Sequence, residues 1–410
     1  MTFVLGLRCV HCNARYPLAP MFEGCPACAT ESLASGLTPE YDYAAIRAAL
    51  KDGPLEEERV AGVWRYRRLL PVIDPAYELS LGEGGTALVP LPRIARELGA
   101  AEVWLKDESR NPTWSFKDRH AAVTVSKARE HGATTLVVST SGNHGVSVAA
   151  YAARGGLSCV AITYPGVSES ARVLMQAYGA RLAVTSPEGR WAIMRSGVNE
   201  RGWYPAANYT DIPTNSAYGH EGYKTIAFEL HAQLGGVIPD LVAVPVAYAE
   251  GLYGIWKGFD ELVKLGRAHQ TPRMLACEPL GGALGTALER GNGPIARVAR
   301  TPTVARGLGG PANSYIGVAA LAVSDGLAAQ ASDAEILAAQ RDLALDGIFA
   351  EPAAAASLAG VRVVHQRGEL PRGLRIVLVS TSGGLKNLEA LSGSFLEPAE
   401  IEPTLAALEA

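Results

Sequence analysis

The sequence lacks the features that mark membrane proteins, secreted proteins and nucleic-acid-binding proteins. No uninterrupted apolar stretch approaches the ~18 residues that a membrane-spanning helix needs. The first residues show no basic segment followed by a long apolar run, so no signal peptide is predicted. Lysine and arginine form no run, and the formal net charge is −4, which argues against nucleic acid or an anionic membrane as a partner. We therefore expect a cytoplasmic protein that acts on a small molecule.

Internal repeats and low-complexity segments are also absent, and 410 residues are too many for one ordinary core. From about residue 80 onward, short apolar runs alternate with amphipathic segments, which predicts βαβ units and mainly parallel sheets. The expected strands are Glu102–Lys106, Thr135–Ser139, Cys159–Thr163, Arg181–Thr185, Leu241–Val246, Arg273–Glu278 and Arg375–Val379. The expected helices are Lys117–His131, Gly145–Arg154, Ser168–Tyr178, Gly222–Gly235, Leu252–Leu265, Asp333–Gly347 and Glu351–Arg367.

One lysine follows a turn in the segment Asn111-Pro-Thr-Trp-Ser-Phe-Lys-Asp-Arg119. Asn-Pro-Thr favours a turn, and Ser115 is expected to cap the helix that follows. Lys117 would then lie in the first turn of that helix, where the positive end of the helix dipole disfavours its ammonium form. Because imine formation needs a neutral amine, this position suits a lysine that binds a carbonyl group. The alternative is a solvated lysine with Asp118 and Arg119 as surface partners.

Three polar, glycine-containing loops connect predicted strands to the segments after them: Ser139–Gly145, Ala247–Gly254 and Ser380–Lys386. In open α/β sheets, ligands bind at the carboxyl ends of the strands, and a following helix offers backbone N–H groups to an anion. A hydroxyl in the third loop could face the ring nitrogen of a bound cofactor and, being neutral, leave that nitrogen unprotonated. Each loop alone is also compatible with an ordinary connection.

Together with Gly82-Glu-Gly-Gly-Thr86, these segments resemble the threonine synthase family within the fold-type II (tryptophan-synthase-β-like) pyridoxal phosphate (PLP) enzymes. The resemblance extends from about residue 80 to 390 and keeps the family's motif order, which continues with Glu221-Gly-Tyr-Lys-Thr225, Trp256-Lys-Gly-Phe259, Phe349-Ala-Glu-Pro352 and Gly384-Leu-Lys386. It implies an α/β fold of two three-layer αβα domains with PLP in the cleft between them. It also implies a lyase that converts O-phosphohomoserine and water into threonine and phosphate by γ-elimination and β-addition.

Five parts of the chain are expected on this basis. Residues 1–35 would form an N-terminal cysteine unit, and residues 36–80 a helix and an arm. The large PLP-binding domain would contain residues 81–119 and 216–395, the small domain residues 120–215, and the C-terminal tail residues 396–410. We expect a homodimer, because the Tyr41–Leu70 arm could reach a partner subunit.

The resemblance also implies roles for individual residues. Lys117 would hold PLP as a Schiff base and shuttle the Cα proton of an amino-acid substrate. The other implied cofactor contacts are Phe116 beside the ring, Asn143 at the phenolic oxygen, Gly251 and Gly254 at the phosphate, and Thr381 at the pyridine nitrogen with Ser380 as an alternative. The implied substrate contacts are Thr86, Ser139, Thr140 and Ser141, with Lys224 as a further candidate.

Departures from the family pattern bear on the substrate. The family's phosphate cradle, Gly-Asn-Ala-Gly-Asn, is here Ala247-Tyr-Ala-Glu-Gly251, which brings the Glu250 carboxylate near a phosphate. Trp114 and His120 replace glycines and are expected to add bulk beside the site.

A further departure concerns an arginine that helps the family to bind the substrate phosphate. Tyr218-Gly-His220 stands in its place, and Lys224, His220 or Arg119 could compensate for its loss. Three alternatives therefore stay open. The first is a threonine/serine dehydratase or ammonia-lyase, because the segment Ser-Gly-Asn-His-Gly of this chain resembles the corresponding loop of those enzymes. The others are a β-replacement enzyme similar to cysteate or cysteine synthases, and a PLP- and zinc-binding relic without catalysis.

Four of the six cysteines lie within the first 28 residues, as Cys9-x-x-Cys12 and Cys25-x-x-Cys28. Two such knuckles, twelve residues apart, are typical of a zinc ribbon with a four-thiolate site. A closed site of this kind leaves no open coordination position, so the Zn²⁺ would be structural. An iron centre could use the same four ligands, whereas disulfides are disfavoured in a reducing compartment.

Overall fold

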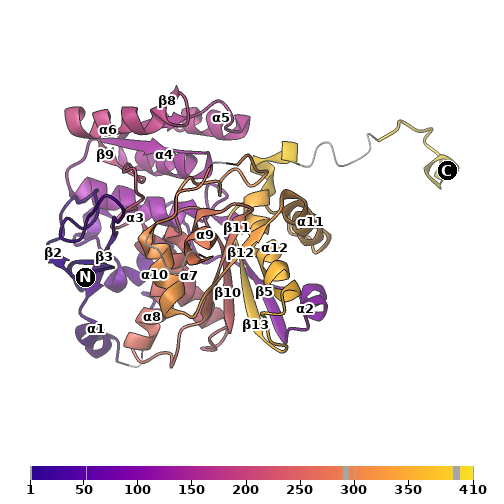
Figure 1. Ribbon diagram of the computed structural model, residues 1–410, viewed down its shortest axis with the longest axis horizontal. Coiled ribbons are helices and arrows are strands. Elements are labelled where there is room, and N and C mark those ends of the chain that lie inside the picture. The colour runs from indigo at the N-terminus through magenta and orange to yellow at the C-terminus, as the bar shows by residue number, and fades with distance from the viewer. Residues whose placement is uncertain (1, 52, 290–294, 300, 391–397, 410) are drawn as a thin grey trace.

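The computed structural model describes residues 2–51, 53–289, 295–299, 301–390 and 398–409. These residues form two α/β lobes and a small N-terminal unit (Figure 1). The larger lobe is built on a sheet with the strand order β12-β11-β10-β13-β5-β4, in which only β4 runs antiparallel to its neighbour. Its strands are β4 (Leu88–Pro90), β5 (Glu102–Asp107), β10 (Leu241–Pro245), β11 (Arg273–Pro279), β12 (Leu327–Ala331) and β13 (Arg375–Ser380).

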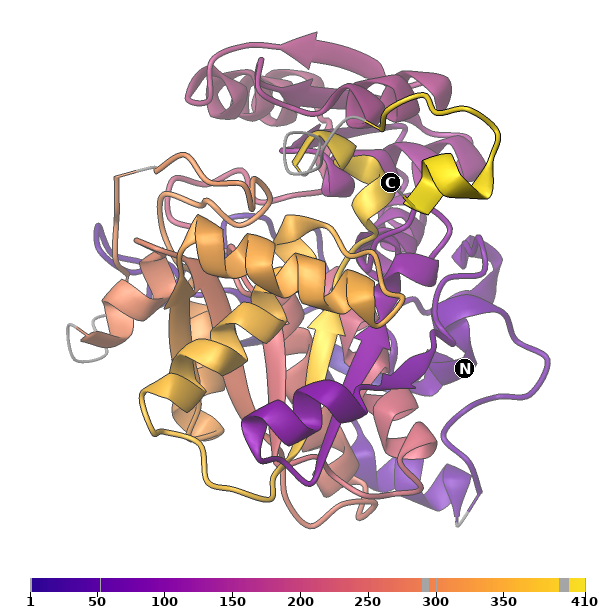
Figure 2. The same cartoon turned by 90° about the vertical axis from the view of Figure 1, so that its right-hand side faces the viewer.

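Helices cover both faces of the larger sheet, because its central strands are apolar on both sides. Alternate residues of β10 belong to different core clusters: Val242 and Val244 pack on one face, and Leu241 and Ala243 on the other. The first face is covered by α7 (His220–Gln233), α8 (Glu250–Lys264) and α10 (Tyr315–Val323). The second face is covered by α2 (Pro92–Leu98), α11 (Asp333–Leu345) and α12 (Pro352–Gln366), which lie in front of the sheet in Figure 2. The short α9 (Ala283–Glu289) follows β11.

The smaller lobe has a sheet with the strand order β8-β7-β6-β9, and all of its pairs are parallel. Its strands are β6 (Thr135–Ser139), β7 (Ser158–Thr163), β8 (Arg181–Val184) and β9 (Tyr204–Pro205). Its helices are α3 (Lys117–Glu130), α4 (Asn143–Gly155), α5 (Glu169–Ala177) and α6 (Gly189–Arg201). Helix α3 also packs against α7 of the larger lobe and so joins the two lobes.

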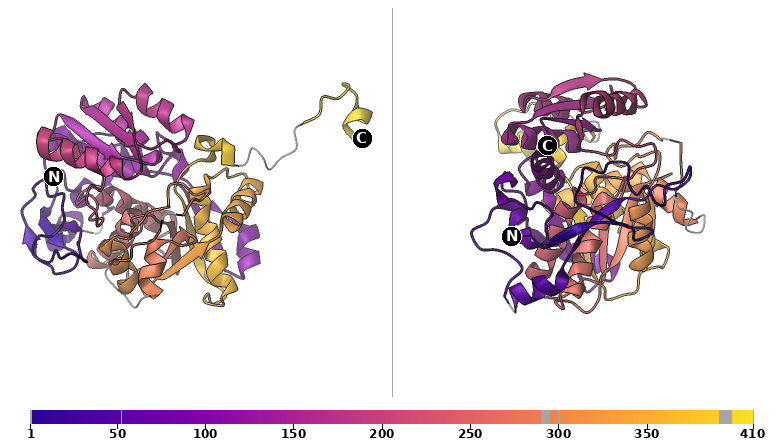
Figure 3. Two further views of the ribbon diagram at one scale, coloured as in Figure 1. Left: turned by 45° about the horizontal axis from the view of Figure 1, so that its top comes forward. Right: turned by 90° about the vertical axis from the view of Figure 1, so that its left-hand side faces the viewer.

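The N-terminal unit is an antiparallel sheet of the order β2-β1-β3. Its strands are β1 (Val4–Cys9), β2 (Arg15–Tyr16) and β3 (Leu37–Tyr41), followed by α1 (Tyr43–Leu50) and the 3₁₀ turns Gly62–Leu69 and Pro75–Tyr77. The unit lies beside both lobes (Figure 3). The arm after it packs on its own chain: Trp64 Nε1 donates to Leu79 O (2.6 Å) and Arg267 donates to Gly53 O (2.7 Å).

All seven expected strands and all seven expected helices are present, with bounds that differ by up to two residues. The sequence patterns did not predict β4, β12, α2, α6, α9 and α10. The prediction of Ser115 as a helix cap is wrong by one residue: Phe116 is the N-cap, and Ser115 Oγ accepts the N–H of Lys117 (3.3 Å). Short turns Glu108–Arg110, Gly384–Lys386 and Leu388–Ala390 follow β5 and β13, and α13 (Leu405–Glu409) lies apart from the lobes in Figure 1. No helix among the described residues is long and apolar enough to cross a membrane.

Candidate active site

A cavity of about 170 Å³ lies at the carboxyl ends of β6, β10 and β13, where the two lobes meet. A single water needs ~10–15 Å³ of such space, so the cavity has room for a bound group of roughly ten times that size. The three polar loops singled out in the sequence all contribute to its wall. Among its lining residues are Phe116, Lys117, Ser139, Thr140, Ser141, Asn143, Gly251 and Thr381.

Lys117 is the first residue of α3 and extends its amine into this cavity. Its Nζ lies 4.9 Å from the centre of the Phe116 ring and 5.6 Å from that of Tyr223. No described residue accepts a hydrogen bond from Nζ or forms an ion pair with it. Burial lowers the pKa of Lys117 below that of a free lysine, and the negative charge of Glu250 opposes this only in part. Burial thus favours the neutral form of the amine, which is the form that reacts with a carbonyl group.

Glu250, the first residue of α8, lines the cavity, and its carboxylate contacts His120 and the backbone of Ser216. Its Oε1 lies 3.4 Å from His120 Nε2 and accepts the N–H of Ser216 (3.0 Å). Burial alone would raise the pKa of Glu250, but His120 and Lys117 hold that pKa well below its usual range. These contacts fix the carboxylate in place at the cavity wall.

The start of α8 presents an anion-binding backbone. Ala249 caps the helix with φ 60°, and the N–H groups of residues 250–252 precede the first intrahelical hydrogen bond, from Tyr253 N to Ala249 O (2.9 Å). Gly251 is required here because a Cβ would come within 2.7 Å of the Phe116 ring. Gly254, which was predicted to bind phosphate, lies in the second turn of α8, where a Cβ would overlap His220 O of α7. Its small size therefore permits the close packing of α8 on α7.

The other predicted cofactor residues, Asn143, Thr381 and Ser380, differ in the hydrogen-bond partners of their side chains. Asn143 Nδ2 donates to Glu351 Oε2 (2.7 Å), and Ser382 Oγ donates to the same oxygen. Thr381 lines the cavity, its carbonyl accepts the Phe116 N–H (2.9 Å), and no described residue hydrogen-bonds to its hydroxyl. Ser380 Oγ is fully buried without a partner and does not line the cavity, so Thr381 is the better placed of the two hydroxyls.

The loop after β6 brings three hydroxyls to the cavity, of which two are available to a ligand. Ser139 Oγ is buried and has no hydrogen-bond partner among the described residues. Ser141 is half-buried on the cavity wall. Thr140, predicted to bind substrate, also lines the cavity, but its Oγ1 accepts the N–H groups of Gly142 (3.0 Å) and Gly145 (2.9 Å), and this hydroxyl therefore stabilises the loop.

Thr86 and Lys224 were predicted to bind substrate, and the structure places both outside the lining of this cavity. Thr86 Oγ1 donates to Glu108 (2.6 Å) within a buried network around Arg119, which pairs with Glu108 and Glu229. Lys224 is fully buried between Glu221 and Glu261. Because each charge is satisfied in the interior, none is available to a ligand.

His220 is likewise engaged elsewhere, since it bonds to Thr38 Oγ1 (3.0 Å) and Ser216 O (2.9 Å). The three residues that were expected to compensate for the missing arginine, His220, Lys224 and Arg119, are therefore all outside the cavity. Trp114 was expected to add bulk beside the site, but its side chain is 44% exposed and absent from the cavity wall. Its φ of 60° explains why the family pattern has glycine at this position.

His144 is a cavity residue for which the sequence suggested no role. Its Nε2 lies 2.8 Å from Ala206 O, a carbonyl that can only accept, so Nε2 carries the proton. Nδ1 is then a buried acceptor without a partner among the described residues. Burial, together with nearby His120 and Lys117, lowers the pKa of His144 to about 3. The ring is neutral at physiological pH and can accept a hydrogen bond from a ligand.

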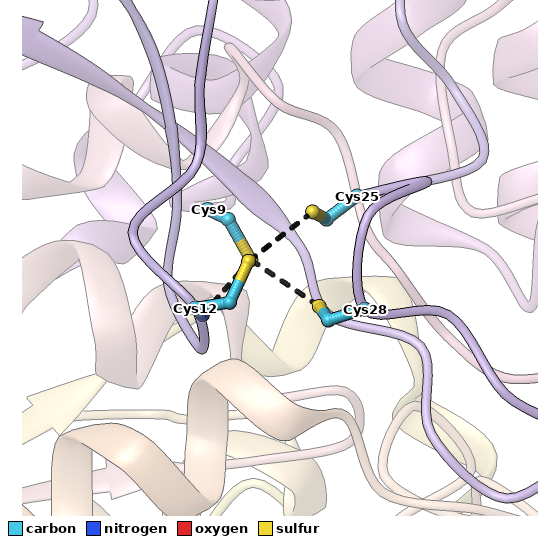
Figure 4. Close-up of side chains that lie close together, drawn as sticks. All are labelled: Cys9, Cys12, Cys25 and Cys28. Atoms are coloured by element: carbon cyan, nitrogen blue, oxygen red, sulfur yellow. Dashed lines mark hydrogen bonds between the residues drawn. The ribbon is translucent and has the colours of Figure 1, made fainter.

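The four N-terminal cysteines converge in one cluster (Figure 4). All four Sγ atoms lie within 4.8 Å of one another, and the pairs Cys9–Cys28 and Cys12–Cys25 are each 3.6 Å apart. None of them forms a disulfide. The backbone N–H groups of His11 and Cys12 both point at Cys9 Sγ (3.4 Å each). These four thiols are a group that could hold a metal ion.

Comparison with known proteins connects this geometry to a family. A model described as "Pyridoxal-phosphate dependent enzyme" matches residues 79–382. The threonine synthase of Methanocaldococcus jannaschii is 33% identical over 403 residues, covering 96% of each chain. That of Methanosarcina acetivorans is 32% identical over 413 residues, covering 98% of this chain and 97% of its own. The chain belongs to the threonine synthase family of PLP-dependent enzymes.

A solved structure supports the fold. The crystal structure of O-ureido-L-serine synthase superimposes with a TM-score of 0.63 at 25% identity, covering 80% of this chain and 98% of that one. The chain is therefore a PLP-dependent lyase with the fold-type II architecture. The cavity fits the cofactor: Lys117 offers an amine without a partner among the described residues, α8 offers free N–H groups, and Thr381 offers a free hydroxyl.

Sequence reasoning missed several residues of the cavity wall. Glu351 and Lys386 lie within motifs that the family shares, and that was the available signal. Lys386 Nζ donates to Thr113 O (2.7 Å), and burial lowers its pKa to about 8. Trp191 and Arg306 also line the cavity, from segments that carry no motif.

Proposed function

We propose that this protein is a threonine synthase that converts O-phosphohomoserine and water into threonine and phosphate. The observation that carries the proposal is the buried Lys117 amine, without a described partner and with a lowered pKa, in a cavity at the carboxyl ends of both sheets. The M. jannaschii and M. acetivorans relatives, whose names give this activity, match nearly the full length of the chain.

Each part of the cavity wall has a distinct task in this reaction. PLP, when bound in this cavity, would supply a ring that withdraws electrons from the substrate's Cα once the substrate amine has replaced Lys117 on the cofactor. The Lys117 amine removes the Cα proton and later returns it. Ser139, Ser141 and the N–H groups at the start of α4 bind the substrate carboxylate. The start of α8 holds the cofactor phosphate, Asn143 the phenolic oxygen, and the neutral Thr381 hydroxyl the ring nitrogen.

The experiment is a substrate panel with the PLP-loaded protein. O-Phosphohomoserine, O-phosphoserine, threonine and serine are supplied separately, and phosphate, threonine and 2-oxo acid are measured. We expect phosphate and threonine in equal amounts from O-phosphohomoserine. A 2-oxo acid from threonine or serine, without turnover of O-phosphohomoserine, would show a dehydratase instead. Turnover of O-phosphoserine with an added nucleophile would show a β-replacement enzyme.

Lys117→Ala provides the matching control for the chemistry. We expect it to lose the visible absorbance of lysine-bound PLP and to lower turnover by about 10²–10⁴-fold. Lys264→Ala, which removes a 41%-exposed lysine of α8, should leave both unchanged. PLP absorbance that persists in Lys117→Ala would contradict the role of Lys117.

We also propose that Cys9, Cys12, Cys25 and Cys28 bind a structural Zn²⁺. A tetrahedral site with Zn–S bonds of about 2.3 Å places its sulfurs about 3.8 Å apart, close to the 3.6 Å of the two shortest pairs. We expect one zinc per chain in the wild type and none in the Cys9→Ser/Cys12→Ser double variant, with Cys159→Ala as the control. Zinc retained by the double variant, or iron in the wild type, would overturn the assignment.

A further inference from the structure

A second cavity, of about 420 Å³, opens from the first. The two share part of their walls, including Ser139, Ser141, Trp191 and Arg306. The second cavity lies between α6 of the smaller lobe and a wall of the larger lobe formed by Arg297, Arg306 and residues 309–312. A substrate whose carboxylate is held by the Ser139–Ser141 loop would therefore have this space beside it.

Four arginines line the second cavity: Arg190 and Arg195 on α6, and Arg297 and Arg306 in the segment opposite. The acidic residues in its wall are Glu188 and Asp211. Four positive and two negative groups give the cavity a net charge of +2, although the whole chain carries −4. Such a concentration of guanidinium groups in a concave site favours a multiply charged anion.

The side chains of these arginines differ in how firmly their contacts fix them in place. Arg190 is 8% exposed, and its NH1 donates to Thr140 O (3.2 Å), so it is fixed against the loop that lines both cavities. Arg195 pairs with Asp211 (2.6 Å). Arg306, about half exposed, lies 3.7 Å from Glu389 and can turn toward a ligand at little cost.

No other cation of the described wall can take this role. Lys117 is the cofactor lysine, Lys386 donates to Thr113 O inside the loop structure, and His144 is neutral. The three residues that could have replaced the family's arginine, Arg119, Lys224 and His220, are paired in the interior.

We propose that this arginine-lined cavity binds the phosphate of the substrate, a phosphomonoester dianion, in place of the arginine that the family has near residue 219. The inference rests on the proposed function, because it assigns the leaving group of that reaction to a site. The dianion would be bound by arginines of both lobes at once, so its binding would also hold the two lobes together.

The test uses the PLP-loaded protein, in which the cofactor phosphate already occupies the start of α8. Inorganic phosphate is titrated by calorimetry into the wild type, Arg297→Gln, Arg306→Gln and the control Arg372→Gln, which changes an exposed arginine on the connection before β13. We expect measurable binding to the wild type and the control, and binding weakened about tenfold or more in the two cavity variants. Equal binding by all four proteins would overturn the proposal.

Kinetics separate this inference from the proposed function. If the function is right, Arg306→Gln should raise KM for O-phosphohomoserine about tenfold and leave kcat nearly unchanged, because the arginine binds phosphate and moves no proton. An unchanged KM would overturn the site while leaving the function intact. If the wild type releases no phosphate from O-phosphohomoserine, the function fails, and the loss of phosphate binding in the variants still decides whether the cavity is an anion site.

Discussion

The imidazole of His120 fills the space in which a side chain on residue 219 would begin. An ideal Cβ on Gly219 would overlap His120 Nε2, and the same nitrogen faces Glu250 at 3.4 Å. The family pattern has glycine at the position of His120 and an arginine near that of Gly219. The side chains of His120 and Glu250 and the glycine at position 219 are therefore spatially coupled in this chain.

The coupling can be measured with a double-mutant cycle. Gly219 has an ordinary helical φ of −63°, so Gly219→Ala should cost about 1–3 kcal/mol through overlap, chiefly with His120 and also with Thr124 Oγ1. In a His120→Ala background, the same substitution should cost clearly less, because the nearest obstacle is gone. Urea unfolding of the four proteins gives the interaction energy. Equal costs in both backgrounds would contradict the coupling.

Lys224 should matter for stability and not for substrate binding. Lys224→Met leaves the buried Glu221 and Glu261 without one of their cations, which should lower the free energy of unfolding by about 3 kcal/mol or more. KM for the substrate should not change, because Lys224 lies outside the cavity. The control Lys264→Met alters an exposed pair and should change stability by less than about 0.5 kcal/mol. An increase in KM at a temperature where the variant is folded would restore Lys224 as a substrate residue.

His144 should make the fold sensitive to acid. Its pKa falls from 6.5 in the unfolded chain to about 3 in the fold, so the unfolded state binds more protons between these values. The stabilisation is complete above pH 6.5 and is lost as the pH falls toward 3, by up to about 1.4 kcal/mol per pH unit.

The His144 contribution is isolated by comparison with His144→Gln, which keeps a donor for Ala206 O but does not titrate. Burial raises the pKa of Asp118 to about 6 and that of Glu278 to about 7, and these groups act in the opposite sense in both proteins. As the pH falls from 6 to 4, we expect the unfolding free energy of the wild type to decrease relative to that of His144→Gln. An identical slope would mean that His144 is charged in the folded protein.

Gly251 and Gly254 should separate cofactor binding from helix packing. In Gly251→Ala the new methyl group would meet the Phe116 ring at 2.7 Å, so PLP affinity should fall about tenfold or more. In Gly254→Ala the methyl group would overlap the α7 backbone, so the melting temperature should fall while PLP affinity of the folded protein stays the same. PLP titrations and thermal unfolding of both variants test this. Equal losses of PLP affinity would return Gly254 to the cofactor site.

The elements that could be predicted from the sequence are those with a strong local signal. Strands such as Leu241–Pro245 are continuous apolar runs buried on both faces, and the structure places them within a residue or two. Strand β12 (Leu-Ala-Ala-Gln-Ala) has no β-branched residue, and α6 starts without a side-chain cap. Neither segment carries the composition or the boundary residue on which a sequence-based prediction depends.

The residues of the candidate site likewise fall into those with a local sequence signal and those without one. Lys117 and the loops after β6, β10 and β13 were predictable because turn residues and strand ends mark them locally. The pairing of Arg119 could not be predicted, because its partner Glu229 is 110 residues away in the chain. The same holds for the contact between His120 and Glu250, which are 130 residues apart. Charge alone could not tell whether these groups point inward to each other or outward to a ligand.

The contact between β3 and the larger lobe sets the size of the smallest fragment that can fold independently. Lys257 Nζ donates to Thr38 Oγ1 (2.8 Å) and Pro39 O (2.7 Å), and Tyr41 donates to Glu221 (2.7 Å). A truncated protein that begins at residue 79, where the family match starts, would retain the lysine and the glutamate and lose these partners. Lys257 and Glu221 would keep their ion pair with each other, but they would lose the hydrogen bonds from β3, and the surface beneath this strand would be uncovered. The N-terminal unit is thus an integral wall of the catalytic body, and expression of the catalytic region alone should yield aggregated protein.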